Sequence, residues 1–155
     1  MLYTLLKTLH IVGVVALVGN AIVTLVWKMA ADRLADPRVI AFAQRLVTQT
    51  DWWFTVGGVL LIALGGYGAA AVAGLRVFEA WWVVWGQVLL GLSGALWACI
   101  LIPAQIRQAR QARAFAEDGQ IPASYWRDAR RWVVWGIIAT VPLLGAIWLM
   151  VAKPA

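Results

Sequence analysis

The first apolar stretch of the chain carries a stripe of polar and small residues. At 100° per residue the members of this stripe fall within an arc of about 80° on one face of a helix. They are His10, Gly13, Leu17, Asn20, Thr24 and Lys28. An unpaired polar group facing lipid is costly, so we expect this face to look toward the rest of the protein.

His10 is the only histidine in the chain and the residue best suited to chemistry. A neutral imidazole is a common axial ligand of haem iron, and Gly13, one turn further along, would let a flat ring approach the helix. Lys7 and Arg76 are candidates to receive a propionate or a lipid phosphate, or are simple interfacial cations. The structural alternative for His10 is a hydrogen bond to a backbone carbonyl or to Gln87.

Several other chemistries are disfavoured by the residues present. One histidine and one cysteine, Cys99, cannot build a tetrahedral zinc site or an intrachain disulfide. No phosphate-binding glycine loop or serine elbow is found. We expect Asp51 to cap the start of the second apolar run, which would leave no carboxylate within a span and would argue against an ion-coupled transporter.

The elements that must position these residues are membrane-spanning helices. Of the 155 residues, 63% are hydrophobic and 13% charged, whereas soluble domains have roughly 45–50% and 25%. A span needs about 20 apolar residues, and four runs qualify, at 3–27, 52–75, 80–102 and 132–151. The sequence therefore predicts an all-α fold, a single domain over 1–155 forming an antiparallel four-helix membrane bundle with cytoplasmic helical extensions.

The connection at 103–131 is predicted to be basic and helical. Arg107, Arg110 and Arg113 lie on successive turns of the predicted helix. Gly119 should end that helix, and Pro122 lies near the predicted start of the next one. Tyr125 and Trp126 then mark the headgroup level. Within the membrane we expect small residues to form packing seams. One such ridge comprises Gln87, Gly91, Gly94 and Ala98; glycines of the second and fourth spans supply others.

The distribution of charge predicts the orientation. The net charge is +6, and ten of the 13 Lys and Arg residues lie in the first and third connections. Because positive charge is retained in the cytoplasm, both connections should face inward and both termini outward. Basic residues that flank apolar runs favour lipid headgroups, and not nucleic acid, as their partner.

Four separated segments carry a resemblance to a known family. LLKTLHIVG, TDWWFT, IPASYWRDARRW and WLMVAKP occur in the order seen in bacterial predicted integral membrane proteins of domain of unknown function 2269, which the chain resembles over nearly its whole length. LKTLHI alone is similar to HemJ-type protoporphyrinogen oxidases and CopD-like membrane proteins. In the HemJ-type family a first-helix histidine binds haem, and this maps onto His10. The resemblance implies a bacterial inner membrane, in which the outward-facing termini predicted from the charge distribution would be periplasmic.

The leading functional expectation is binding of haem b or another tetrapyrrole by His10, with a role in electron transfer or porphyrin chemistry. With one histidine per chain, the second axial position would be taken by another residue type, left vacant, or filled by His10 of a homodimer partner. The alternatives are a non-catalytic module that binds lipid or a redox or scaffold partner protein, and a carrier of small hydrophobic molecules with a tryptophan-lined cavity.

Overall fold

The computed structural model describes residues 1–154 as a long bundle of helices with short connections. Its elements are α1 (Leu2–Leu34), α2 (Pro37–Thr50), η1 (Asp51–Val56), α3 (Gly57–Val72), α4 (Trp81–Leu96), η2 (Trp97–Leu101), α5 (Ile102–Asp118) and α6 (Ala123–Ala152). The elements η1 and η2 are π-helical. The all-α prediction is confirmed, and no strand occurs in the part of the chain described.

Four continuous helical rods are long and apolar enough to cross a membrane. Two of them contain a π-helical segment near the middle: Pro37–Val72 joins α2 to α3 through η1, and Trp81–Asp118 joins α4 to α5 through η2. At 1.5 Å per residue the 33 residues of α1 extend about 50 Å, which exceeds a hydrocarbon core of about 30 Å. The rods therefore extend beyond the apolar layer, as predicted.

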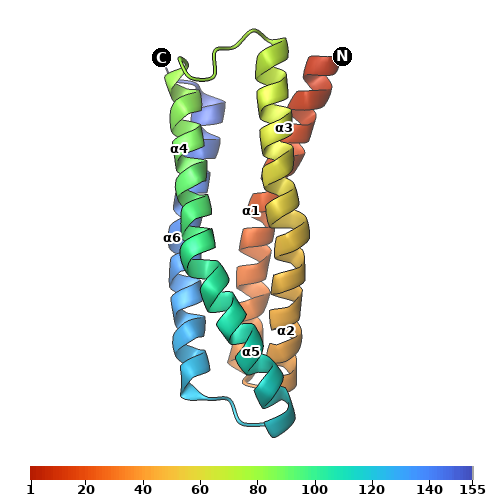
Figure 1. The fold of residues 1–155 in the computed structure, drawn as a ribbon, viewed down its shortest axis with the longest axis vertical. Helices are drawn as coiled ribbons and strands as arrows, with labels where there is room; N and C mark the ends of the chain where they lie inside the picture. The colour runs from red at the N-terminus through yellow and green to blue at the C-terminus, as the bar shows by residue number, and fades with distance from the viewer. Residues whose placement is uncertain (155) are drawn as a thin grey trace.

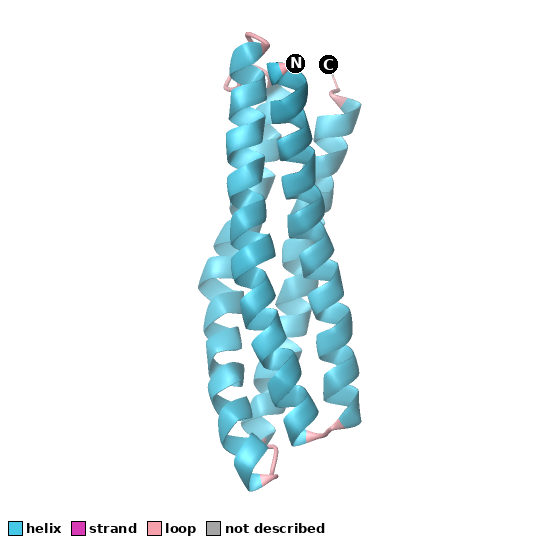
Figure 2. Cartoon of the chain, turned by 90° about the vertical axis from the view of Figure 1, so that its right-hand side faces the viewer, coloured by secondary structure: helices cyan, strands magenta, loops and turns pink. Residues whose placement is uncertain are grey.

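The two halves of the bundle differ in how the rods pair. In one half α1 packs along α3 and α4 packs along α6, whereas in the other α5 crosses to contact α2 as well as α6 (Figure 1). Both termini lie at the end formed by the paired half (Figure 2). The arginine-rich connections lie at the opposite end, which we call the arginine end. It comprises the α1–α2 and α5–α6 connections and the helix ends beside them.

Local sequence explains where the rods end. The Asp36 carboxylate accepts hydrogen bonds from the backbone N–H groups of Arg38 and Val39, and Pro37 occupies the first turn of α2. Gly119 ends α5 with a left-handed φ of 75°, and α6 begins after Pro122. The predicted stop and start in this connection are confirmed.

One helix seam is very tight. A Cβ on Gly13 of α1 would lie 2.7 Å from the Gly58 carbonyl oxygen of α3, and one on Gly65 would lie 2.5 Å from the His10 backbone nitrogen. The predicted ridge on the third span is wrong. A Cβ on Gly91 or Gly94 would meet nothing within 4 Å, because this face of α4 points away from the bundle.

Candidate functional site

His10 lies on α1 against the glycine-rich face of α3. Its ring Nδ1 is 2.9 Å from the backbone carbonyl oxygen of Ile62, and the ring packs over Gly66, where a Cβ would lie 2.8 Å from Nδ1 and 3.1 Å from Cε1. Nε2 lies farther from that position than Nδ1 and Cε1 do. The half-buried imidazole is therefore held on one side by α3.

The other residues expected to surround a cofactor are not gathered around His10. Gly13 is buried against α3, so its missing side chain serves helix packing there. Arg76 pairs with Glu79 in the exposed connection, at 2.7 Å from Nη1 to Oε2. Lys7 is exposed, and its Nζ lies 6.0 Å from the centre of the Tyr3 ring.

Gln87 on α4 bonds elsewhere and does not pair with His10. Its Oε1 accepts a hydrogen bond from the Tyr67 hydroxyl at 2.7 Å, and its Nε2 donates to the Val77 carbonyl at 3.3 Å. These contacts tie α4 to α3 and to the connection between them. Of the two structural partners considered for His10, a backbone carbonyl is the one observed.

A second polar site, which the sequence did not indicate, lies where η1 meets α1. Asn20 Nδ2 donates to Asp51 Oδ1 at 2.8 Å and to Thr55 Oγ1 at 3.0 Å, and the Thr55 hydroxyl donates to the same Asp51 oxygen at 3.1 Å. The side chains of Gln105 and Trp97 also lie against this carboxylate. Four segments of the chain thus converge on Asp51.

The expectation that Asp51 caps a helix is wrong. Asp51 has helical φ and ψ of −61° and −39°, and the helix continues through it from Pro37 to Val72. Its side chain turns into the bundle because Asn20 and Thr55 supply hydrogen-bond donors there. Asp51 also begins the π-helical segment η1, and single π-helical turns within α-helices often occur at functional sites.

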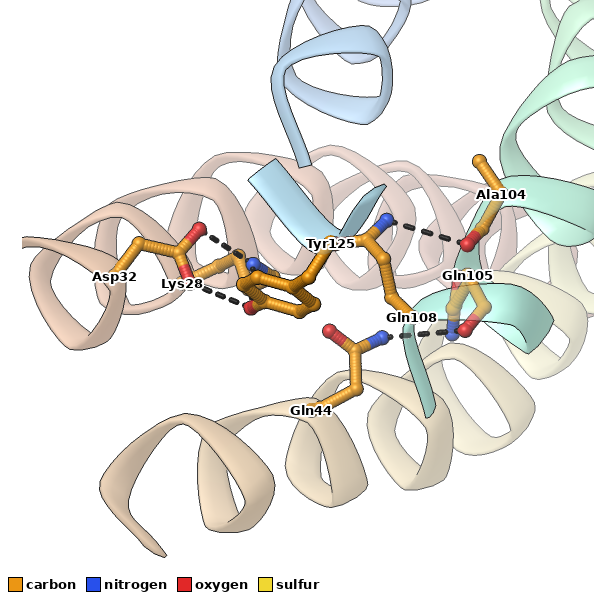
Figure 3. Close-up of polar contacts among 7 residues, drawn as sticks. All are labelled: Lys28, Asp32, Gln44, Ala104, Gln105, Gln108 and Tyr125. Atoms are coloured by element: carbon orange, nitrogen blue, oxygen red, sulfur yellow. Dashed lines mark hydrogen bonds and ion pairs between the residues drawn. The ribbon is translucent and has the colours of Figure 1, made fainter. Parts of the chain in front are cut away.

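A third polar group lies closer to the arginine end and joins α1 to α6. The Lys28 ammonium contacts Asp32 and donates to the Tyr125 hydroxyl at 2.7 Å, and the Tyr125 hydroxyl donates to Asp32 Oδ1 at 2.6 Å (Figure 3). Lys28 is 1% exposed and Tyr125 0%. Tyr125 is therefore a core residue of the bundle near the arginine end, with its hydroxyl turned toward α1.

Three glutamines line the core between α2 and α5. Gln44 Nε2 donates to the Gln105 backbone carbonyl at 3.5 Å, and Gln108 Nε2 donates to the Ala104 carbonyl at 3.3 Å (Figure 3). All three are buried, and the side-chain oxygens of Gln44, Gln105 and Gln108 have no hydrogen-bond partner. Because buried polar atoms in proteins are nearly always paired, these unpaired oxygens distinguish the α2–α5 contact from the rest of the core.

The surface around the arginine end is strongly basic. Arg107 forms an ion pair with Asp128, with Nη2 and Oδ1 3.1 Å apart. Exposed arginines without an ion pair in residues 1–154 surround it on α5 and α6, namely Arg110, Arg113, Arg127, Arg130 and Arg131. The opposite face of α5, including Phe115, packs into the core. The segment 103–131, predicted as a basic connection, is therefore part of the bundle and presents one basic face.

Two open grooves lie along α1. One, of about 240 Å³, runs between α1 and α6 and is lined by aliphatic side chains and Thr140. The other, of about 260 Å³, lies between α1 and α2 and includes Trp27 and Phe42. Neither is lined mainly by tryptophan, and Trp148, considered for such a lining, is 62% exposed. Trp97 lies beside Asp51.

Comparison with known families agrees with this architecture. The model of the family described as predicted integral membrane protein (DUF2269) matches residues 4–154. The chain belongs to this family. No curated protein and no solved structure matches the chain. The DUF2269 description itself assigns a membrane location and no activity, so the function has to be inferred from the sites described above.

Proposed function

We propose that this DUF2269 protein binds haem b or a related tetrapyrrole through His10 and serves electron transfer or porphyrin chemistry. The observation that carries the proposal is the 2.9 Å contact between His10 Nδ1 and the Ile62 carbonyl oxygen. A metal-ligating histidine almost always donates its other ring N–H to a carboxylate, a carbonyl or water, which fixes the tautomer and the ring orientation. With Nδ1 protonated, Nε2 carries the free lone pair.

The residues near His10 fit such a ligand in part. Gly66 gives the imidazole room beside α3, and the carbonyl of Ile62 holds it in place. Lys7, one turn before His10, presents an exposed ammonium that suits a propionate. When bound, a haem would supply one-electron redox chemistry, which no side chain near His10 provides. Gly13, Arg76 and Gln87 are engaged elsewhere, so the proposal does not depend on them.

The test is an absorbance spectrum of protein purified from haem-replete cells through an affinity tag that contains no histidine. We expect a Soret band in the wild-type protein and its loss in His10→Ala. Thr8→Ala is the matched control, because Thr8 is exposed on the same helix and bonds only the Thr4 carbonyl of its own turn. Folded protein that stays colourless and takes up no added haemin would contradict the proposal.

A second candidate function is supported by the basic face of α5 and α6. We propose that these arginines bind anionic lipid headgroups, because exposed cations next to an apolar bundle are attracted to anionic lipid. Replacing Arg107, Arg110 and Arg113 by Gln should reduce co-purified anionic lipid, whereas His10→Ala should not. If the arginine variant instead releases a defined partner protein and retains its lipid, the face is a protein docking site.

A further inference from the structure

The open groove between α1 and α6 lies at the depth of the hydrocarbon. Residues 21–26 of α1 and 137–144 of α6 line it, and both stretches fall within the apolar runs 3–27 and 132–151. Its one hydroxyl group, on Thr140, donates to a carbonyl of its own helix at 2.8 Å. The remaining lining is aliphatic, and atoms that face an unfilled space lose dispersion contacts. The groove therefore suits a hydrocarbon chain.

Two arginines flank the groove where it opens toward the arginine end. Arg33 follows Val26 by seven residues on α1. Arg130 precedes Ile137 by the same seven residues on α6. Seven residues are about two helical turns, which return each arginine to the face of its helix that lines the groove. Both arginines are exposed, and neither takes part in an ion pair over residues 1–154.

The hydrogen bonds of Tyr125 hold the two helices together beside these arginines. Tyr125 of α6 donates to Asp32 of α1 at 2.6 Å, and Asp32 directly precedes Arg33. Arg130 follows Tyr125 by five residues, which is about 7.5 Å along α6. The Asp32 carboxylate is already compensated by the Lys28 ammonium, so the charge of Arg33 is left for another anion. The two arginines therefore stand on the two sides of one opening.

We propose that this groove binds one anionic phospholipid, with an acyl chain along α1 and α6 and the phosphate between Arg33 and Arg130. Long basic side chains near the ends of a span reach to the headgroup level. Guanidinium groups there donate charge-assisted hydrogen bonds to phosphate oxygens. Trp126, one turn from Arg130 on the same face of α6 and 38% exposed, adds an aromatic ring of the kind found at that level.

The inference rests on the anionic-lipid function proposed above and places one lipid at a position of its own. Asp128, which pairs with Arg107 of α5, lies about 160° around α6 from Arg130. The groove site therefore faces α1, whereas the arginine face of α5 lies on the other side of α6. Two cations also select the headgroup, because phosphatidylcholine carries its own cation beside the phosphate and phosphatidylglycerol does not.

The experiment is thermal unfolding of the full chain in a neutral detergent, titrated with phosphatidylglycerol or with phosphatidylcholine of the same acyl chains. We expect the wild-type midpoint to rise and saturate with phosphatidylglycerol, because a ligand that binds only the folded state stabilises it. Replacing Arg33 and Arg130 together by Gln should raise the apparent Kd at least about fivefold. Arg110→Gln with Arg113→Gln removes the same charge from α5 and should change the Kd less than about twofold.

The groove is tested separately from the arginines. Ala21→Phe places a ring in the groove and should weaken phosphatidylglycerol binding although both arginines remain. Ala95→Phe, at an exposed alanine of α4, is the matched control and should not weaken it. Native mass spectrometry of the same samples counts the bound lipid directly, and one phosphatidylglycerol per wild-type chain should survive where phosphatidylcholine is lost.

Measurements on the wild-type chain can overturn the proposal without any variant. Equal midpoint shifts with the two lipids would show that the arginines do not select the headgroup. A full response to glycerol phosphate alone would show an anion site that needs no acyl chain. If only the α5 double variant weakens binding, the anionic-lipid function stands and the groove site is wrong, whereas no saturable response to phosphatidylglycerol would overturn both.

Discussion

The Lys28 ammonium donates a hydrogen bond to the Tyr125 hydroxyl over 2.7 Å, which links α1 to α6 across 97 positions of the chain. The same ammonium lies 4.9 Å from the centre of the Tyr125 ring. Because Tyr125 in turn donates to Asp32, all three groups are satisfied by one another. Removing one member of a buried, charged group leaves the others unpaired, which costs more than the group gains by forming.

Replacing Lys28 should therefore destabilise the protein more than replacing both charged partners. We expect Lys28→Met to lower the free energy of unfolding by about 3 kcal/mol, since it leaves the Asp32 carboxylate without its cation. The double variant Lys28→Met with Asp32→Asn should recover part of this loss. Unfolding curves in a denaturing detergent, analysed as a double-mutant cycle, measure the coupling.

The control for that cycle is Arg33→Met, at the exposed neighbour of Asp32 on the same helix. A surface substitution of this kind should change stability by no more than about 0.5 kcal/mol. Equal losses in the Lys28 and Arg33 variants would contradict the assignment of Lys28 to a buried, paired group.

The glycines predict a sharp contrast between two helix faces. Gly65→Ala should be destabilised by about 1–3 kcal/mol, because the added methyl group would lie 2.5 Å from backbone atoms of α1, which cannot move aside easily. Gly94→Ala places the same methyl group in open space and should have little effect or stabilise the helix slightly. Thermal midpoints of the two variants in one detergent provide the comparison, and a reversed order would contradict the packing of α1 on α3.

The sequence predicts the polar stripe of α1 correctly but does not predict its partners. Periodicity within one helix is local information, and the buried face of α1 is indeed Gly13, Leu17, Asn20, Thr24, Lys28 and Ala31. Which row of glycines forms a close helix contact depends on which helices pair. The rows of glycines in α3 and α4 cannot be told apart by sequence in this respect. Only the pairing of α1 with α3 makes Gly65 tight and leaves Gly94 open.

The role of Asp51 is not predictable from the sequence for a related reason. A carboxylate directly before an apolar run has the local pattern of a helix cap, whereas its actual role depends on Asn20, 31 positions away in the chain. The same holds for the burial of Tyr125, because its hydrogen-bond partner Asp32 lies 93 positions away in the chain. His10 stands out in the sequence because it is the only histidine, and its contact with a backbone carbonyl is one of the two structural partners expected for it.

A hydrogen bond between α4 and α6 predicts a smaller but measurable effect. Ser93 Oγ donates to the Ala139 carbonyl and is buried, and interhelical hydrogen bonds of this kind in membranes average about 0.6 kcal/mol. Ser93→Ala should lower stability by that amount. Thr140→Ala is the matched control, since Thr140 bonds only the Gly136 carbonyl of its own helix. A loss in the Thr140 variant equal to that of Ser93→Ala would argue against the interhelical role.

The orientation of the bundle can be tested with single cysteines, because Cys99 is the only natural one. In a Cys99→Ser background, Phe78→Cys places a thiol in the exposed α3–α4 connection, and Gln120→Cys places one in the α5–α6 connection at the opposite end. Positive charge concentrated at the arginine end predicts that this end faces the cytoplasm. A maleimide that does not cross the membrane should therefore label Phe78→Cys in intact cells and leave Gln120→Cys unlabelled until the membrane is opened. Labelling in the reverse order would mean that the charge rule fails for this chain and would move His10 to the cytoplasmic half of the bundle.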